Sequence, residues 1–316
     1  MTYMGNQGLL AGFRDYIARL TEERRYSTAK SYRDALNSFM RFHGREEAFI
    51  PYTFLTRETL RRYESYLSAL GRSRNTISTY MRRLRCVYHL AVDAGEVPLI
   101  PRLFKDVFTG VECGRKRALK AEEQRRLLEV SVEDPELRRS QVAAGLMLHL
   151  GGMPFVDLAH LTAGQVKEGE LHYHRQKTGT LIRLRLLERA HPLLSELTGG
   201  MPPGSRYLLP LLEGELEGYA AWRAYRSALT RMNRHLERIR RLAGIESKVT
   251  TYTIRHTFAT SLKEIGVSVE MIAELLGHRS IRTTQTYLRD FSLDRQTEAR
   301  RACLEAIYAC DDRVTV

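Results

Sequence analysis

The sequence predicts a mainly α-helical protein in two domains: a helical N-terminal domain, then an α+β domain with a small antiparallel sheet. The chain has 316 residues, more than a single hydrophobic core usually spans. Apolar residues recur at helical spacing through the first hundred positions. Between Leu171 and Leu187, two short runs of alternating character flank a glycine-containing turn. We therefore expect domains at 1–108 and 118–316, with a linker at 109–117.

The N-terminal domain is predicted to contain four amphipathic helices. Each stripe places apolar residues three or four positions apart, so that they share one side of a helix. Glycines at positions 71 and 95 end the third and fourth helices. The stripes begin at Leu9, Tyr32, Leu60 and Ile77.

The segment between Val97 and Arg117 loses this periodicity and contains two prolines, two glycines and a basic cluster, which favours a linker. Helices are expected again at 121–130 and 141–150, and the second is apolar enough to lie in a core. Residues 219–242 form a long amphipathic pattern whose polar side is rich in arginine.

The charge of the chain favours a polyanionic partner. There are 50 Lys and Arg against 37 Asp and Glu, a net charge of +13, and most of the basic residues are arginine. The planar arginine fork suits two-point contacts to phosphate oxygens and to guanine edges. A GC-rich coding sequence also enriches arginine, so part of the bias has that simpler origin.

Two predicted helices carry rows of basic residues opposite their apolar stripes. Such a row is a solvated face in many proteins, but the net charge favours DNA binding here, with the fourth helix in a major groove. The residues predicted to contact DNA are Arg72, Arg74, Asn75, Arg82 and Arg85 in and before the fourth helix, and Arg223, Arg226 and Arg234 in the helix at 219–242.

Other sequence features argue against a metal site, a membrane-spanning segment and a secretion signal. The four cysteines have no CxxC spacing, and no stretch is long and apolar enough to span a bilayer. The N-terminus lacks the pattern of a signal peptide. We expect a cytoplasmic protein with no bound metal.

The strongest local pattern lies between Thr251 and Leu288. A helix is predicted from about Thr253 to Ile265, followed by a second helix that Ser268 caps and Gly277 ends. His278 comes next, and Tyr287 stands nine residues later.

These residues resemble the signature of the tyrosine recombinase, or phage integrase, family: Tyr252-Thr253-Ile254-Arg255-His256, then Leu276-Gly277-His278, then Tyr287. TAKSYRDALNSFMRF and SRNTISTYMRRLRCVYHLAV are similar to the family's helical core-binding domain, and KRALKAEE resembles the start of its catalytic domain. GMPFVDLAHL and YHRQKTG resemble the branch found in Bacteroidetes conjugative elements, phages and DNA invertases. No arm-binding domain is visible, which suggests a two-domain member.

The resemblance implies a site-specific DNA recombinase. Tyr287 would be the nucleophile that forms a 3′ phosphotyrosine, Arg255 and His278 would hold the phosphate, and Lys177 would protonate the leaving 5′ oxygen. Attack on an anionic phosphodiester needs such positive donors. Since the phosphotyrosine stores the bond energy, no ATP, metal or other cofactor is expected.

The sequence departs from the family pattern at two positions. Pro154 stands where most members have the first catalytic arginine, in Gly152-Met153-Pro154, and Tyr252 stands where a histidine is usual. A phenol can donate a hydrogen bond but is a poor base at neutral pH. We expect Asp157 to orient its neighbours. Candidates for a substitute arginine are Arg138 and Arg139 first, then Arg175 and Arg279, unless Arg255 acts alone.

The expected partner is double-stranded DNA carrying specific recombination sites, with accessory DNA-bending proteins as further candidates. We expect a monomer in free solution and a homotetramer on DNA. A segment after Tyr287 is amphipathic enough to dock on a neighbouring protomer; it includes Ala302, Cys303, Leu304, Ile307 and Tyr308. The sequence leaves open whether the outcome is integration, excision or inversion.

Three alternatives to this interpretation stay open. A DNA-binding regulator with a helix-turn-helix would need neither Tyr287 nor Lys177. A type IB topoisomerase would use the same phosphotyrosine chemistry to relax DNA without exchanging partners. A degenerate recombinase retained for a structural role would explain the missing arginine.

Overall fold

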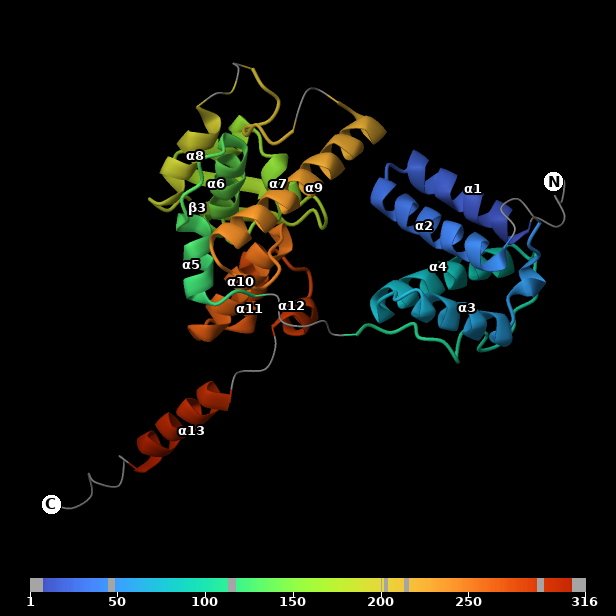
Figure 1. The fold of residues 1–316 in the computed structure, drawn as a ribbon. Helices are drawn as coiled ribbons and strands as arrows, with labels where there is room; N and C mark the ends of the chain where they lie inside the picture. The colour runs from blue at the N-terminus through green and yellow to red at the C-terminus, as the bar shows by residue number, and fades with distance from the viewer. Residues whose placement is uncertain are drawn as a thin grey trace. The chain divides into compact units, whose positions relative to one another are not determined.

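The chain forms two compact units, residues 1–114 and 115–316 (Figure 1). The computed structural model describes residues 8–44, 49–112, 118–199, 201, 204–212, 216–288 and 293–308. The division between the units falls within the segment predicted to be the linker.

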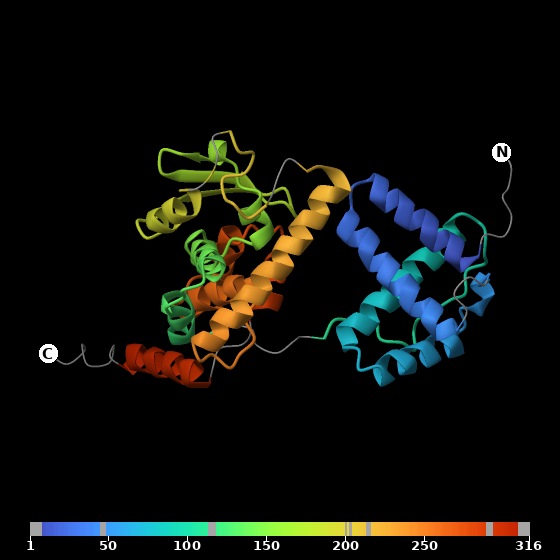
Figure 2. The ribbon, with the colours of Figure 1, turned by 45° about the horizontal axis from the view of Figure 1, so that its top comes forward.

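The N-terminal unit contains the four predicted helices. They are α1 (Leu9–Glu22), α2 (Tyr26–His43), α3 (Arg57–Ala69) and α4 (Arg74–Asp93), with a 3-10 turn, η1 (Tyr52–Phe54). Helices α1 and α2 pack along each other, and α4 contacts α1, α2 and α3 (Figure 2). The apolar stripes meet in one core, where Phe13, Phe39, Tyr63, Met81 and Leu84 are fully buried.

The segment after α4 continues to pack on this unit. Leu103, Phe104 and Val107 are buried in its core although they follow no helical or strand period. Ser78 Oγ of α4 donates a 2.6 Å hydrogen bond to the Gly110 carbonyl. Gly110 and Glu112, which the sequence placed in the linker, are both hydrogen-bonded to side chains of α4, the second through Asn75.

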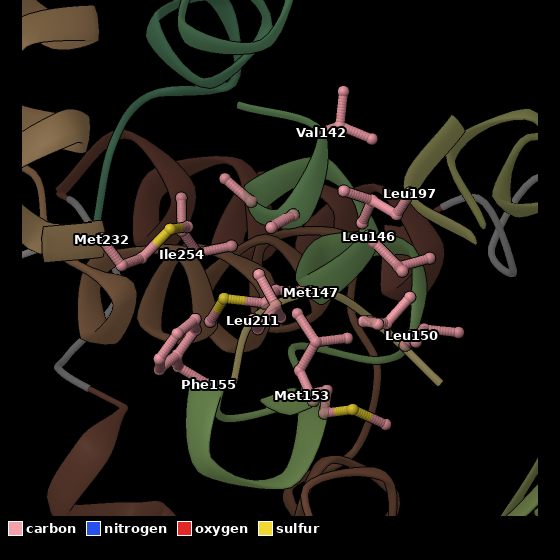
Figure 3. Packing of buried hydrophobic residues seen from close by; sticks show 14 of the residues in the cluster. Val142, Leu146, Met147, Leu150, Met153, Phe155, Leu197, Leu211, Met232 and Ile254 are labelled. Atoms are coloured by element: carbon pink, nitrogen blue, oxygen red, sulfur yellow. The ribbon is translucent and has the colours of Figure 1, made fainter. Parts of the chain in front are cut away.

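The C-terminal unit is built around α6 (Pro135–His149), whose Ala143, Ala144 and Met147 are fully buried. It packs against α8, α9 and α10. Figure 3 shows Met147 among Met232 of α9, Ile254 of α10 and Phe155 of α7. The helices and turn besides α6 are α5 (Ala121–Glu129), α7 (Phe155–Ala159), η2 (Ala163–Gln165), α8 (Ala190–Thr198), α9 (Gly218–Leu242), α10 (Thr251–Glu264), α11 (Val269–Leu275), α12 (Ile281–Tyr287) and α13 (Leu293–Tyr308).

The predicted small antiparallel sheet is confirmed. Strands β2 (Glu170–His174) and β3 (Leu181–Arg185) pair with Tyr173 opposite Ile182. A short strand not predicted from the sequence, β1 (Val166–Lys167), pairs with the other edge of β2. Leu171 and Tyr173 face the core, while His172 and His174 are exposed.

Helices α10 to α12 arise from local capping. Helix α10 begins two residues earlier than expected, because the Thr250 hydroxyl accepts from the Thr253 amide and caps it. Ser268 caps α11 as predicted, by accepting from the Met271 amide. Helix α12 was not predicted. None of the helices in the described part of the chain is long and apolar enough to cross a membrane.

Candidate active site

The carbonyl of Leu276 lies at the centre of the site. It follows α11 in a turn where Gly277 adopts a φ of +63°, a conformation that favours glycine. Arg255 Nη2 of α10 donates to this oxygen at 2.6 Å, and Arg175 Nη1 donates to the same oxygen. Both arginines are more than nine-tenths buried. Two guanidinium groups thus converge beside the turn that leads to His278.

Arg255 also holds the loop that contains Pro154. Its Nη1 donates to the Gly152 carbonyl at 2.8 Å. Gly152 has a φ of +66°, and a Cβ added there would lie 2.9 Å from Cδ1 of Phe258, on the same helix as Arg255. This position therefore requires glycine for two reasons, its left-handed backbone conformation and the close approach of α10.

Asp157 connects α7 to the hairpin. Its side chain is fully buried, with Oδ2 2.9 Å from Arg175 Nε, although the two groups are not aligned as a hydrogen bond. Its Oδ1 accepts from the Gln176 amide at 2.8 Å. Burial raises the pKa of Asp157, while the Gln176 amide and the charges of Arg175 and Arg255 oppose the rise. Asp157 thus contacts both Arg175 and the Gln176 amide, and its orienting role stays a prediction.

Lys177 lies in the β2–β3 turn. The turn is closed by the Arg175 amide, which donates to the Thr180 carbonyl at 2.9 Å, and by the Gly179 amide, which donates to the Arg175 carbonyl at 2.8 Å. The Lys177 side chain is exposed. Arg279 reaches the same turn, because a Cβ added at Gly179 would lie 3.6 Å from its Nη2.

His278 contacts Arg255 on one side and α12 on the other. Its Nε2 is 3.3 Å from Arg255 Nη2, and its Nδ1 is 2.7 Å from Oγ1 of Thr284, which is fully buried. An arginine only donates, so we assign the proton to Nδ1 and the accepting lone pair to Nε2. Burial, followed by the charges of Arg255, Arg175 and Lys177, lowers the pKa of His278 to about 4. The imidazole is therefore neutral near pH 7.

Tyr287 ends α12, one helical turn beyond Thr284. Its backbone is placed, but its side chain lies outside the described residues. Tyr252 lies one turn before Arg255 on α10 and is 45% exposed. Its ring stacks on His256, with centroids 6.2 Å apart.

The leading candidates for a substitute arginine were wrong. Arg138 and Arg139 lie in the first turns of α6, at the end opposite the loop of Pro154. Arg138 is paired with Glu196 at 2.7 Å and Arg139 with Glu136 at 2.6 Å. Of the four candidates, Arg175 shares a hydrogen-bond acceptor with Arg255. Sequence reasoning missed Thr284, whose one signal was its spacing of three residues from Tyr287.

The residues predicted to contact DNA have exposed side chains. Two of them are engaged within the N-terminal unit. Asn75 hydrogen-bonds the backbone of Glu112, and the guanidinium of Arg74 lies 4.4 Å from the centre of the Phe108 ring. For all eight residues, DNA contact stays a prediction. In the described part of the chain, no group of three or more His, Cys, Asp or Glu is placed to hold a metal ion.

The sequence and the fold match known proteins over nearly the whole chain. The model of the phage integrase family matches residues 117–292, and that of the phage integrase SAM-like domain matches residues 8–102. Tyrosine recombinase XerD of Listeria monocytogenes is 26% identical over 294 residues, covering 86% of this chain and 92% of that protein.

Two solved structures share the fold. A lambda integrase dimer bound to a COC' core site has a TM-score of 0.67 at 16% identity, covering 91% of this chain and 80% of that one. The Tn1549 transposon integrase in complex with a circular intermediate DNA also has a TM-score of 0.67, at 15% identity, covering 93% of this chain and 99% of that one. Because the family model spans more than half of its length, the chain belongs to the phage integrase family of tyrosine-type, site-specific DNA recombinases.

Proposed function

We propose that the chain cuts and rejoins DNA at specific sites through attack by Tyr287 on a phosphodiester. The observation that carries this is the convergence of Arg255 and Arg175 on the Leu276 carbonyl beside His278. Burial, and then the charges of Arg255, Arg175 and Lys177, lower the pKa of that histidine, and three positive side chains beside it favour an anion. Fixed positive donors in a buried site stabilise the charge of a phosphoryl transition state.

In the cleavage step, the Tyr287 oxygen bonds to phosphorus as the bond to the 5′ oxygen breaks. The phenol proton leaves to solvent, and Lys177 gives a proton to the departing 5′ oxygen. The product is a 3′ phosphotyrosine. Attack by a 5′ hydroxyl of another strand reverses the step and exchanges the strands.

Three other side chains support the transition state in this proposal. The phosphodiester charge raises the pKa of His278, so that Nε2 gains a proton, gives up its contact with Arg255 Nη2 and donates to a nonbridging oxygen. Tyr252, which is 45% exposed, donates a hydrogen bond from its hydroxyl. Asp157 is a positioning residue, because it contacts Arg175 and accepts a hydrogen bond from the amide of Gln176, the residue before Lys177.

Arg175 takes the place of the arginine missing at Pro154. Arg175→Ala is expected to lower cleavage at saturating protein by about 10²-fold or more, the scale of a lost oxyanion donor. Arg175→Lys keeps the charge but loses the two-point fork and should recover only part of the rate. The matched control is Arg185→Ala on the same hairpin, an exposed residue paired loosely with Glu170. A folded Arg175→Ala protein that cleaves at the wild-type rate would exclude this role.

Double-stranded DNA is the proposed partner, and a homotetramer is the proposed assembly on it. Exposed arginines on α4 and α9 support contact with the phosphate backbone of DNA. They are Arg82 and Arg85 on α4, and Arg223, Arg226 and Arg234 on α9. Removing one phosphate contact should reduce the slope of log affinity against log salt by about 1. Docking of α13 on a neighbouring protomer is part of the same proposal.

A recombination assay tests the function. Selection from a random duplex library identifies the bound sequence, which is then placed twice in a plasmid. The wild-type chain should invert or excise the intervening DNA, whereas Tyr287→Phe should bind the site without product. Relaxation of a plasmid that lacks the site would instead indicate a topoisomerase, and tight binding without any strand exchange would indicate a regulator.

A further inference from the structure

His278 is hydrogen-bonded on two sides, to the helix that carries Arg255 and to the helix that ends at Tyr287. Its Nε2 is 3.3 Å from Nη2 of Arg255 on α10, and its Nδ1 is 2.7 Å from Oγ1 of Thr284 on α12. Because the guanidinium can only donate to Nε2, the proton is on Nδ1 and the Thr284 hydroxyl accepts from it. The hydrogen bonds therefore run in one direction, from α10 through the imidazole to α12.

Two buried residues anchor the end of α12 that carries Tyr287. Thr284 is fully buried, and the Leu288 amide donates to its carbonyl at 2.8 Å. Leu288 is buried in a small core with Ala259 of α10 and Ile272 of α11. Tyr287 thus lies in the last turn of α12, between a residue bonded to His278 and a residue packed in this core.

We propose that Thr284 is a positioning residue, whose hydroxyl accepts from Nδ1–H of His278 and thereby holds this imidazole against the turn of α12 that carries Tyr287. The role rests on the proposed function, in which His278 and Tyr287 act on one phosphodiester. Thr284 touches no reacting atom itself. It acts through His278, by fixing which nitrogen is protonated and how the ring lies relative to α12.

The Thr284 contact persists through the proposed reaction, whereas the Arg255 contact does not. An imidazolium donates from both nitrogens, so a protonated Nε2 can leave Arg255 for the phosphate while Nδ1–H still donates to Thr284. A hydrogen bond from a charged donor is shorter and stronger than one between neutral groups. Binding of the phosphate is therefore expected to tighten the link between His278 and α12 when Tyr287 attacks.

The first test locates the proton on His278 without any DNA. Long-range NMR spectra of the full chain with ¹⁵N-labelled histidine distinguish a proton on Nδ1 from one on Nε2, and His278→Asn identifies the signal by its loss. Near pH 7 the wild-type chain and Thr284→Ser should both show the Nδ1–H form. In Thr284→Val, which keeps the shape of the side chain, the buried Nδ1–H has no acceptor, so this form should lose its majority.

The second test measures cleavage of the selected DNA site at saturating protein. Thr284→Val should cleave at least about tenfold more slowly than the wild type, the scale of a lost hydrogen bond to a charged group, while still binding the site. Thr284→Ser keeps the hydroxyl and should recover most of the rate. Thr283→Val is the matched control, because Thr283 is the neighbouring, exposed threonine of α12 and takes the same substitution.

A wild-type His278 with its proton on Nε2 would overturn the inference without any variant. An unchanged tautomer in Thr284→Val would also contradict it, because Arg255 alone would then fix the ring. Cleavage by Thr284→Val at the wild-type rate, or by Thr284→Ser no faster than by Thr284→Val, would exclude positioning by the hydroxyl. The NMR test needs no DNA, so it decides the hydrogen bond even if the chain cleaves none.

Discussion

His278 shows how burial and neighbouring charge act together on a single residue of the site. Its pKa of about 4 lies below the value of about 6.5 expected in the unfolded chain. Between these values the unfolded state binds more protons, so this group makes stability fall as pH decreases from about 6.5 to about 4.

We therefore expect that His278→Asn flattens the pH dependence of the unfolding free energy in this window. Urea titrations of both proteins at several pH values measure it. Parallel curves for the two proteins would show that His278 is not held neutral by its surroundings.

Lys177 allows a chemical test of its role. Lys177→Ala should slow cleavage by a factor on the order of 10² or more, because the leaving 5′ oxygen loses its acid. In a substrate with a bridging 5′ sulfur, the sulfur leaves without protonation. On this substrate, Lys177→Ala should recover most of the cleavage rate. Gln176→Ala, next to it in the same exposed turn, is the control, because the hydrogen bond from Gln176 to Asp157 uses its backbone amide. An equally slow sulfur substrate would assign Lys177 another role.

At the scale of elements, the loop of Gly152 packs against α10 and accepts a hydrogen bond from Arg255. Gly152→Ala should lower the unfolding free energy by more than the roughly 1 kcal/mol that left-handed strain alone costs, because its Cβ would meet Phe258. Gly169→Ala is the matched control, with a φ of +77° and open space around the added Cβ. Equal losses in denaturant titrations of the two variants would show that the close packing is unimportant.

The elements differ in how well the sequence predicts them. Helices α1 to α4 each bury one continuous stripe, so their spacing alone reveals them. Helix α12 has a short sequence, IRTTQTY, with three β-branched threonine and isoleucine positions in its first four residues, and no stripe marks it. Residues 103–112 pack through isolated apolar residues and side-chain bonds to the backbone, which leave no period in the sequence.

At the scale of the whole molecule, the site depends on contacts between distant parts of the second unit. The motif predicted Arg255, His278 and Tyr287, but the acceptor that Arg255 shares with Arg175 is a backbone carbonyl, which has no sequence signature. The contact of Arg175 with Leu276 spans 101 residues, and that of Arg255 with Gly152 spans 103. For this reason the sequence favoured Arg138 and Arg139, which lie close to Pro154 in the chain. Membership of the Bacteroidetes-type branch and a cytoplasmic location stay predictions.

The most direct test of the account is the identity of the residue that becomes joined to DNA. A nicked duplex of the selected site, which loses its 5′ fragment after cleavage, traps the covalent complex. Mass spectrometry after digestion should find the 3′ phosphate on Tyr287, and Tyr287→Phe should bind the duplex without forming any adduct. An adduct that persists in Tyr287→Phe, or one attached to another residue of the wild-type chain, would contradict the account.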